Sequence, residues 1–414
     1  MKNSFKRPKE PSSNLAETTS NNSYYKEESV NLNDWMKEEN LRWTLHHTRQ
    51  LRPSVNVWRG DSAPTPLIHE LHDLDDLSVS GMDGQITSLV DILKQTDTDA
   101  FLVMHQGKVV YEKYFAGIQS YYPHGLASVT KSFVGILTAM QLHNGNIQLD
   151  DTVEKYIPEL SGSAFADATI QQLLDMQVVC QYPQLFPQAS YIDNQLQILL
   201  IAVGAQMAEN NYIGPKTIYE FLSCTSKAVD HGTKFLYSNG PTETLGWILR
   251  RISGKTLAEL LSEQIWSKLG SEEDAYFTID KVFTEQASGG LYATLRDTAR
   301  FAEMLRNDGF YNKQQIVPKE VISEIRKGGN LKLYTASESV KYKPRYSYHN
   351  QWWVNHGNKY GAFEAHGIFG QRIHIAPEAE MVIVQFSSYS DRQKYNDSFK
   401  LFDKAFSDIA DHFN

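Results

Sequence analysis

A serine and a lysine three residues apart, Ser128 and Lys131, are the side chains in this sequence best placed to do chemistry. They open an apolar run without proline that ends at His143-Asn144-Gly145, which predicts a buried helix with a start and a stop signal. Three residues make almost one turn, so the hydroxyl and the amine share a face. Burial and the positive end of the helix dipole both disfavour the charged amine, so we expect the pKa of Lys131 to fall. A partly neutral lysine can take a proton from Ser128 and make it a nucleophile.

The same spacing has a purely structural interpretation. Ser128 would cap the helix while the Lys131 side chain extends to water. Ser23-Tyr24-Tyr25-Lys26 repeats the spacing in a polar segment. The spacing alone therefore leaves both interpretations open.

A second pattern, Tyr237-Ser238-Asn239, precedes a helix predicted to begin near Pro241. A tyrosine oxygen close to Lys131 can hold a lowered pKa and act as a general base, and an asparagine amide can orient a substrate carbonyl or the lysine. A packed tyrosine at a helix entry explains the pattern equally well, and Tyr348-His349-Asn350 repeats it.

A third pattern, His366-Gly367-Ile368, leads into a strand predicted from Arg372. Glycine lets a backbone N–H approach a substrate oxygen closely, so the N–H groups of Ser128 and Ile368 are candidates for an oxyanion hole. The alternative is an ordinary strand start with glycines for packing.

The elements that must position these residues are both strands and helices. Residues 100–105 and 108–115 predict two strands joined by a tight turn at Gln106-Gly107. Further strands are predicted at 372–377 and 380–386, and helices at 84–94, 197–208, 217–222, 242–266, 295–307 and 401–413. The sequence therefore predicts an α+β fold, in which helices flank an antiparallel sheet and a separate lobe is all helical.

The domain organisation follows from the same patterns. Residues 1–32 are rich in Ser, Asn, Lys and Glu, which predicts a disordered tail. Residues 33–414 are predicted to form one catalytic domain, with 33–160 and 285–414 as the α/β lobe and 161–284 as the helical lobe. We expect the functional site in the cleft between the two lobes.

Composition excludes several classes of function. A formal charge of -9 argues against nucleic acid as the main partner. The two cysteines, Cys180 and Cys224, are far apart and indicate neither a disulfide framework nor a zinc site. The sequence shows neither an apolar signal region at its start nor a run of 18 apolar residues, so we expect a cytoplasmic protein without a membrane partner.

Taken together and in this order, S-x-x-K, Y-x-N and the glycine-rich strand resemble the serine β-lactamase and penicillin-binding-protein superfamily. His366-Gly367-Ile368 replaces the Lys-Thr-Gly of true β-lactamases, so the lysine that would meet a β-lactam carboxylate is missing. This variant resembles the class C type esterase branch, and most of all the 6-aminohexanoate-dimer hydrolases. The likeness runs from about Leu32 to the C-terminus and is visible in Asn33-Asp34-Trp35, Arg42-Trp43, residues 98–103, residues 173–177, Gln351-Trp352-Trp353 and residues 367–371.

The resemblance implies a β-lactamase/transpeptidase-like fold and a serine hydrolase that acts through an acyl-enzyme on short esters or on linear amides such as 6-aminohexanoate oligomers. In that family pattern Ser128 is the acylated nucleophile, Lys131 is its activator, and Tyr237 is the base that then protonates the leaving group. The backbone N–H groups of Ser128 and Ile368 form the oxyanion hole.

The resemblance also implies substrate-binding residues. Tyr182, at the start of a proline-containing loop that ends at Tyr191, matches a lid tyrosine, while Asn239, His366 and Gly367 are expected to contact the substrate. Asp193 is a further candidate for binding a substrate amine.

The reaction expected from this resemblance requires no metal and no organic cofactor. The expected partner is a small-molecule ester or amide, and the resemblance suggests a homodimer. Two other functions remain open from the sequence: a D-amino-acid peptidase related to the carboxypeptidases, and a catalytically silent protein that uses the penicillin-binding fold to hold a ligand.

Overall fold

The computed structural model describes residues 30–81 and 85–414. The predicted tail over residues 1–32 lies outside the described residues, except for its last three positions.

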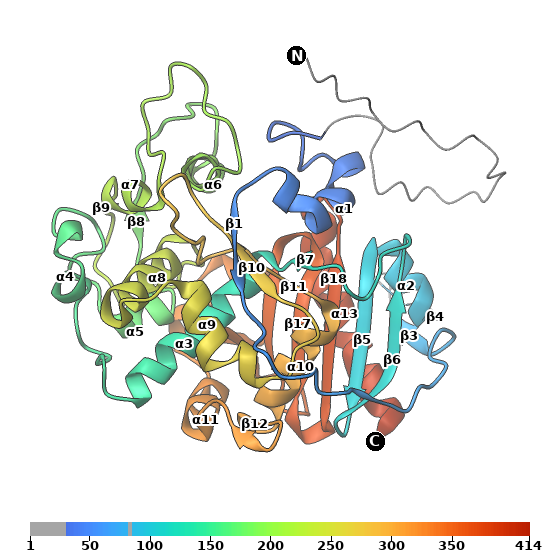
Figure 1. The fold of residues 1–414 in the computed structure, drawn as a ribbon. Helices are drawn as coiled ribbons and strands as arrows, with labels where there is room; N and C mark the ends of the chain where they lie inside the picture. The colour runs from blue at the N-terminus through green and yellow to red at the C-terminus, as the bar shows by residue number, and fades with distance from the viewer. Residues whose placement is uncertain (1–29, 82–84) are drawn as a thin grey trace, which may run out of the picture.

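An eight-stranded sheet runs through the molecule (Figure 1). Its order is β14-β15-β16-β17-β18-β5-β6-β2, and each neighbouring pair is antiparallel except β2 with β6. The bounds are Tyr346–His349 for β14, Trp352–Asn355 for β15, Phe363–Gly367 for β16, Gln371–Ala376 for β17, Met381–Ser387 for β18, Thr98–His105 for β5, Lys108–Tyr114 for β6 and Ile68–His69 for β2. The predicted antiparallel sheet is confirmed.

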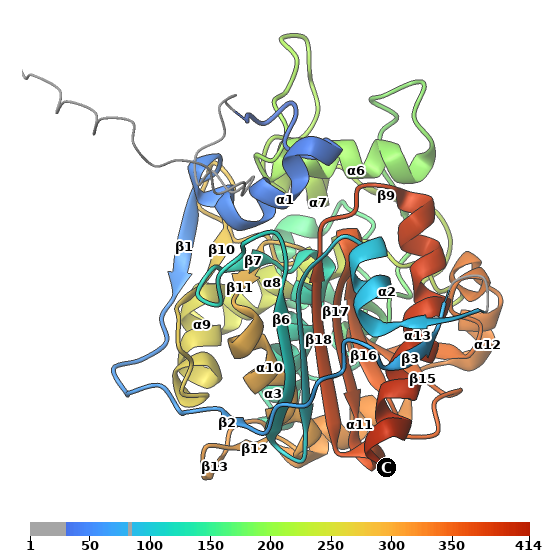
Figure 2. The ribbon, with the colours of Figure 1, turned by 90° about the vertical axis from the view of Figure 1, so that its right-hand side faces the viewer.

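Helices cover both faces of this sheet (Figure 2). On one face α2 (Leu89–Gln95) and α13 (Arg392–Phe413) share an apolar cluster with Phe101, Val103 and Ile383. On the other face α10 (Leu295–Arg306) packs on β5, β17 and β18. Strand β5 lies between these two layers and its residues are buried except the last, which explains why its sequence reads as a continuous apolar run.

The middle of the chain is mainly helical and lies beside the sheet (Figure 1). Its helices are α4 (Val153–Tyr156), α5 (Ile170–Leu174), α6 (Tyr191–Ala202), α7 (Ile218–Ser223), α8 (Gly240–Ser253) and α9 (Leu257–Gln264), and they pack around α3 (Thr130–His143). The remaining helices are α1 (Glu38–His47), α11 (Lys319–Lys327) and α12 (Leu331–Thr335). The predicted α+β class is confirmed. None of the helices described in residues 30–81 and 85–414 has the length and apolar content that a bilayer crossing requires.

A second sheet has four antiparallel strands in the order β1-β10-β11-β7. Its strand β7 comes shortly before α3 in the chain. Its strands are Ser54–Val57, Ala275–Thr278, Leu291–Ala293 and His124–Gly125. Three two-stranded ribbons complete the strands: β3 (Ser78–Ser80) with β4 (Ile86–Ser88), β8 (Cys180–Gln181) with β9 (Ser226–Lys227), and β12 (Phe310–Tyr311) with β13 (Gln314–Gln315). The boundaries proposed for the two lobes stay predictions.

Three predicted helices have different bounds in the structure. The helix predicted at 401–413 begins at Arg392, nine residues earlier. In the predicted helix 84–94, residue 84 lies outside the described chain, and residues 86–88 pair with β3, so α2 begins at Leu89 with Ser88 as its N-cap. The helix predicted at 197–208 begins six residues earlier, because the Ser190 side chain accepts a hydrogen bond from the Asp193 N–H and caps α6.

The helix predicted at 242–266 is two helices. Gly254 has a φ of 67°, a left-handed conformation that favours glycine, and it ends α8. Thr256 then begins α9 through a capping box with Glu259.

Helix α3 is buried on nearly all sides and packs tightly on the turn between β14 and β15. A Cβ on Gly135 would lie 2.5 Å from the Asn350 carbonyl oxygen and 2.7 Å from the Gln351 Cβ. Backbone atoms cannot move aside as a flexible side chain can. Only glycine therefore fits at this position of α3.

We expect Gly135→Ala to lower the free energy of unfolding by about 1–3 kcal/mol, because the added methyl group overpacks a well-filled core. Urea denaturation of the purified protein measures this change. Gly162→Ala is the matched control, since no atom outside its own chain neighbours lies within 4 Å of a Cβ there. Equal stability of the two variants would show that α3 does not pack this closely.

Candidate active site

Ser128 lies in a short 3-10 turn, Ala127–Val129, between β7 and α3. Strand β11 holds this turn on both sides, because the Leu126 N–H donates to the Leu291 carbonyl at 2.9 Å and the Leu291 N–H donates to Thr130 Oγ1 at 3.1 Å. Ala127 has a φ of 46°, a left-handed conformation that is unfavourable for a residue with a Cβ. The fold thus fixes Ser128 in a constrained position, with its residue surface partly exposed.

Lys131 is fully buried, and its amine donates three hydrogen bonds. The acceptors are Ser128 Oγ at 3.0 Å, Asn239 Oδ1 at 2.8 Å and the Ser288 carbonyl oxygen at 2.7 Å. Burial lowers the pKa of Lys131 to about 7, against the opposing effect of the nearby Glu243 carboxylate. The predicted fall in pKa is therefore present, and a large fraction of the amines is neutral at physiological pH.

Tyr237 is far from Ser128 in the sequence but lies beside it in the structure, where the Ser128 side chain partly offsets the effect of burial on the pKa of the Tyr237 phenol. The Tyr237 ring packs on the Trp353 ring at 5.2 Å between centroids. The Lys131 amine lies 5.3 Å from the centroid of the Tyr237 ring. The prediction of a lowered pKa for Tyr237 is wrong, because burial disfavours the phenolate and raises the pKa. The phenol is protonated at neutral pH and is thus a proton donor or relay.

Asn239 lies directly before α8 and joins this group through its contact with Lys131. Behind it, a Cβ on Gly240 would lie 2.8 Å from the Tyr182 hydroxyl, so Tyr182 packs against the backbone next to Asn239. Tyr182 is 6% exposed and its ring stacks on Phe221. The structure therefore places Tyr182 in the wall of the site, buried from solvent.

The glycine-rich turn lies beside the nucleophile. A Cβ on Gly367 would be 2.5 Å from the Leu126 carbonyl oxygen, so the end of β16 touches the backbone that leads to Ser128. Ile368 follows at once and is 40% exposed. The Ser128 and Ile368 N–H groups thus belong to adjoining segments, as an oxyanion hole requires.

His366 has a different environment from that expected of a substrate-binding side chain. It is buried, its Nε2 faces the Glu364 carboxylate, and its ring stacks on Trp353 at 6.0 Å between centroids. Burial lowers the pKa of His366 to about 3, so the ring is neutral. His366 is therefore a buried, neutral residue of β16 and presents no charge to the substrate.

Asp193, the candidate for an amine-binding residue, takes part in the cap of α6. Its carboxylate accepts a hydrogen bond from the Ser190 hydroxyl at 2.7 Å. This contact gives the side chain a structural role at the helix start.

A buried carboxylate that the sequence analysis missed, Glu243, supports the lysine. Its two oxygens accept hydrogen bonds from the Ala287 N–H at 3.0 Å and the Ser288 N–H at 2.9 Å. The Ser288 carbonyl in turn accepts from Lys131. Glu243 is four residues after Asn239 on α8, and this helical spacing is the signal that could have identified it.

Because the Glu243 charge raises the pKa of Lys131, we expect Glu243→Gln to lower that pKa further. The rise of kcat/KM with pH, which follows the loss of the proton from the amine, should then occur at lower pH. The overall rate should also fall, since an amide oxygen cannot replace both carboxylate contacts. The measurement is kcat/KM for a p-nitrophenyl ester against pH.

Glu259→Gln is the control for this variant, since Glu259 caps α9 at an exposed position. Its profile should match that of the unmodified protein. A rise that moves to higher pH in Glu243→Gln would contradict the proposed coupling.

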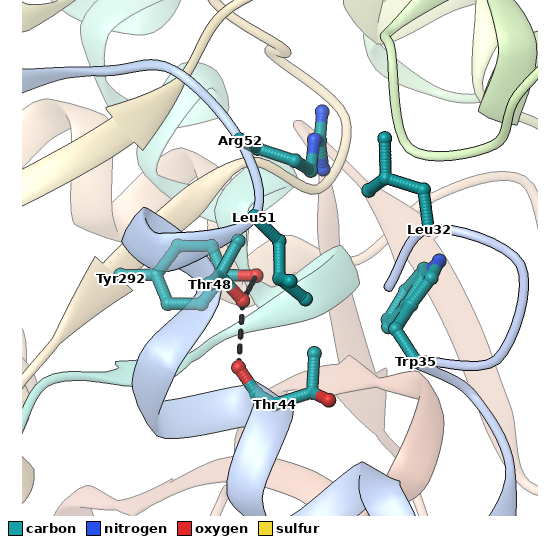
Figure 3. Close-up of a pocket in the computed structure, with 7 residues that line it drawn as sticks. All are labelled: Leu32, Trp35, Thr44, Thr48, Leu51, Arg52 and Tyr292. Atoms are coloured by element: carbon teal, nitrogen blue, oxygen red, sulfur yellow. Dashed lines mark hydrogen bonds between the residues drawn. The ribbon is translucent and has the colours of Figure 1, made fainter. Parts of the chain in front are cut away.

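A cavity elsewhere in the molecule is too small to bind a substrate (Figure 3). It holds about 10 Å³, enough for at most a single water, and is partly closed by the bond from Thr48 to the Thr44 carbonyl. Its lining residues are Leu32, Trp35, Thr44, Thr48, Leu51, Arg52 and Tyr292.

The sheet, the buried lysine in contact with the Ser128 hydroxyl, and the tyrosine beside that serine together define the class of serine hydrolases that form an acyl-enzyme. A family model described as β-lactamase matches residues 86–399. The chain belongs to the β-lactamase family, and the resemblance noted from the motifs is confirmed.

Within that family the chain is similar to 6-aminohexanoate-dimer hydrolases. The 6-aminohexanoate-dimer hydrolase of Paenarthrobacter ureafaciens is 32% identical over 364 residues, covering 87% of this chain and 88% of that protein. A Bacillus anthracis structure, provisionally named for the same activity, is 38% identical with a TM-score of 0.87 and covers 94% of this chain and 98% of its own. EstCE1, a hydrolase with promiscuous acyltransferase activity, is 15% identical with a TM-score of 0.59, covers 78% of this chain and 96% of its own, and shows the shared fold alone.

Proposed function

We propose that this chain hydrolyses short esters and linear amides, including the amide of a 6-aminohexanoate dimer, through an acyl-enzyme on Ser128. The observation that carries the proposal is the 3.0 Å contact between the Nζ of a buried lysine, whose pKa is near 7, and the Ser128 hydroxyl. When the amine is neutral, the hydroxyl donates this hydrogen bond and the amine accepts it. The names of the two similar hydrolases support the choice of a linear amide as one substrate.

The first half of the reaction transfers the acyl group to the enzyme. Neutral Lys131 accepts the Ser128 proton, and the serine oxygen attacks the substrate carbonyl. The Ser128 and Ile368 N–H groups stabilise the oxyanion, at roughly 3 kcal/mol for each donor. The protonated phenol of Tyr237 relays a proton to the leaving alcohol or amine.

The second half releases the acid. Water attacks the acyl carbonyl and passes its proton through Tyr237 or directly to Lys131, and the Ser128 oxygen leaves as a hydroxyl. No step needs a metal or an organic cofactor. Asn239 and the Ser288 carbonyl hold the amine in place throughout, since both accept hydrogen bonds from it.

Penicillins fit this site less well than simple esters. The position that carries a lysine in true β-lactamases is occupied by His366, which is buried and neutral. A β-lactam carboxylate would gain no charge pairing from it.

The other proposals have less support. A D-stereospecific amidohydrolase shares the fold at 15% identity, which supports no substrate assignment. A silent ligand-binding role leaves the lowered pKa of Lys131 without a purpose. The cytoplasmic location and the homodimer stay predictions.

A substrate panel tests the proposal. We expect measurable turnover of p-nitrophenyl acetate and of the 6-aminohexanoate dimer, and slower turnover of nitrocefin than of the acetate ester. Peptides ending in D-Ala-D-Ala should be poor substrates. Faster hydrolysis of nitrocefin would indicate a β-lactamase, whereas ligand affinity without a burst of acyl product would indicate the silent role.

A further inference from the structure

Two histidines and an aspartate from distant parts of the chain meet on the nucleophile's side of the fold. They are His46 on α1, Asp99 on β5 and His124 on β7, and one nitrogen or oxygen of each lies within 4.8 Å of the others. Asp99 and His124 are fully buried. The sequence analysis expected no metal, because the reaction needs none. The three residues are separated by 53 and 25 positions and show no ligand spacing in the sequence.

Both ring nitrogens of His124 face oxygen atoms that can only accept hydrogen bonds. Its Nδ1 lies 2.9 Å from the Gly125 carbonyl oxygen, which only accepts, so Nδ1 carries the proton of a neutral ring. The Nε2 lone pair then points at Asp99 Oδ2, 3.1 Å away, which is another acceptor. Two lone pairs at this distance repel, so a cation has to lie between them, either a second proton or a metal ion.

The His46 ring is the third member of this group. Both of its ring nitrogens are buried, and neither has a side-chain hydrogen-bond partner among the described residues. Its ring meets the His124 ring edge to face at 4.5 Å between centroids. A neutral histidine ring at this place offers one nitrogen lone pair toward the other two side chains.

The other oxygen of the Asp99 carboxylate, Oδ1, already has two hydrogen-bond donors. Asp99 Oδ1 accepts hydrogen bonds from Arg42 Nε at 2.6 Å and from the Ser388 hydroxyl at 3.0 Å. These contacts fix the carboxylate plane and leave Oδ2 directed at His124. Outer contacts of this kind, together with the Gly125 carbonyl on His124, are typical of the second layer around metal ligands.

We propose that His46, Asp99 and His124 bind a divalent transition-metal ion, for which Zn²⁺ is the best match. Nitrogen and oxygen ligands about 2.0–2.1 Å from a tetrahedral ion lie about 3.3 Å apart, close to the 3.1 Å between His124 Nε2 and Asp99 Oδ2. The ligand atoms lie within 4.8 Å of one another, so His46 needs a shift of at most about 1.5 Å to complete the set. No side-chain hydrogen bond of its ring opposes this shift. A water takes the fourth position.

The role of this ion is structural. It ties α1 to β5 and to β7, the strand that ends three residues before Ser128. Binding to the folded chain and not to the unfolded one raises the melting temperature.

The test uses the full chain after treatment with a chelator. Dialysis against ZnCl₂ with metal analysis should give one Zn²⁺ per chain, and thermal unfolding should show a melting temperature about 5 °C higher with the metal than without it. CoCl₂ should give the visible absorption bands of tetrahedral Co²⁺. These readouts do not depend on hydrolase activity.

His46→Gln is the informative variant, because His46 loses no side-chain hydrogen bond when it is replaced and the chain should fold. We expect its Zn²⁺ affinity to fall at least about tenfold. His47→Gln is the matched control, since His47 is the next residue on α1 but is not one of the three ligands and stacks on Trp43, and the variant should bind Zn²⁺ as the unmodified chain does.

Three results would overturn the proposal. The first is no Zn²⁺ above the level of a buffer blank, and the second is equal binding by His46→Gln and His47→Gln. The third is a proton on His124 Nε2 at neutral pH that persists in excess Zn²⁺, seen by ¹⁵N NMR of the histidine rings, because it would show that a proton is the cation between His124 and Asp99.

Discussion

Replacing Ser128 with alanine is expected to reduce kcat/KM for p-nitrophenyl acetate by on the order of 10⁴-fold or more, since no other group can form the acyl-enzyme. The same variant should no longer be labelled by a fluorophosphonate probe. The loss should be chemical and not structural, because Ser128 is partly exposed and its hydroxyl supports no element of the core. Active-site labelling followed by mass spectrometry provides the measurement.

Ser132→Ala is the matched control for this experiment. Ser132 lies four residues after Ser128, in the first turn of α3, and its hydroxyl donates to the Gln351 carbonyl at 2.7 Å. Its removal should cost about 1 kcal/mol of stability and leave labelling intact. Labelling of Ser128→Ala at full rate would show that another residue is the nucleophile.

Substitution of Lys131 by arginine should lower kcat/KM by about 10³-fold, the contribution expected of a general base. Arginine keeps a positive charge at every accessible pH and cannot accept the serine proton. In the unmodified protein the neutral amine is the active form, so kcat/KM should rise with pH through about 7 and then level off. Steady-state kinetics from pH 5 to 9 at constant ionic strength measures both effects, with the range chosen about the pKa.

Lys155→Arg is the control, because Lys155 lies on the surface and pairs with Asp151. It should leave the rate and its pH dependence unchanged. A profile of the unmodified protein that falls as the pH rises through 7 would mean that the ammonium form is the active one, and the assignment of Lys131 as the base would have to be given up.

Local signals in the sequence were enough to predict several features of the fold. Gln106 and Gly107 have φ values of 51° and 77°, as a two-residue turn of type I′ requires, and the hairpin of β5 and β6 forms around them. The fall in the pKa of Lys131 was expected from burial and from the helix dipole, and burial is its largest cause.

Features that depend on contacts outside a single helix or strand could not be predicted in this way. Residues 86–88 have helical spacing but pair with β3, six to ten residues earlier, because this pairing outweighs local preference. The raised pKa of Tyr237 depends on how completely Trp353 and Tyr348 enclose its ring, and neither neighbour is close in sequence. The partners of Glu243 belong to a loop that starts 44 residues later.

The contact between Gly367 and the Leu126 carbonyl bears on how this enzyme can evolve. Since backbone meets backbone there, no side chain can enter without separating the two segments that we propose as the oxyanion hole. A library randomised at residue 367 and selected for ester cleavage should therefore return glycine almost exclusively. New substrate ranges would have to arise from the surrounding loops, while this junction stays the same from one specialised descendant to the next.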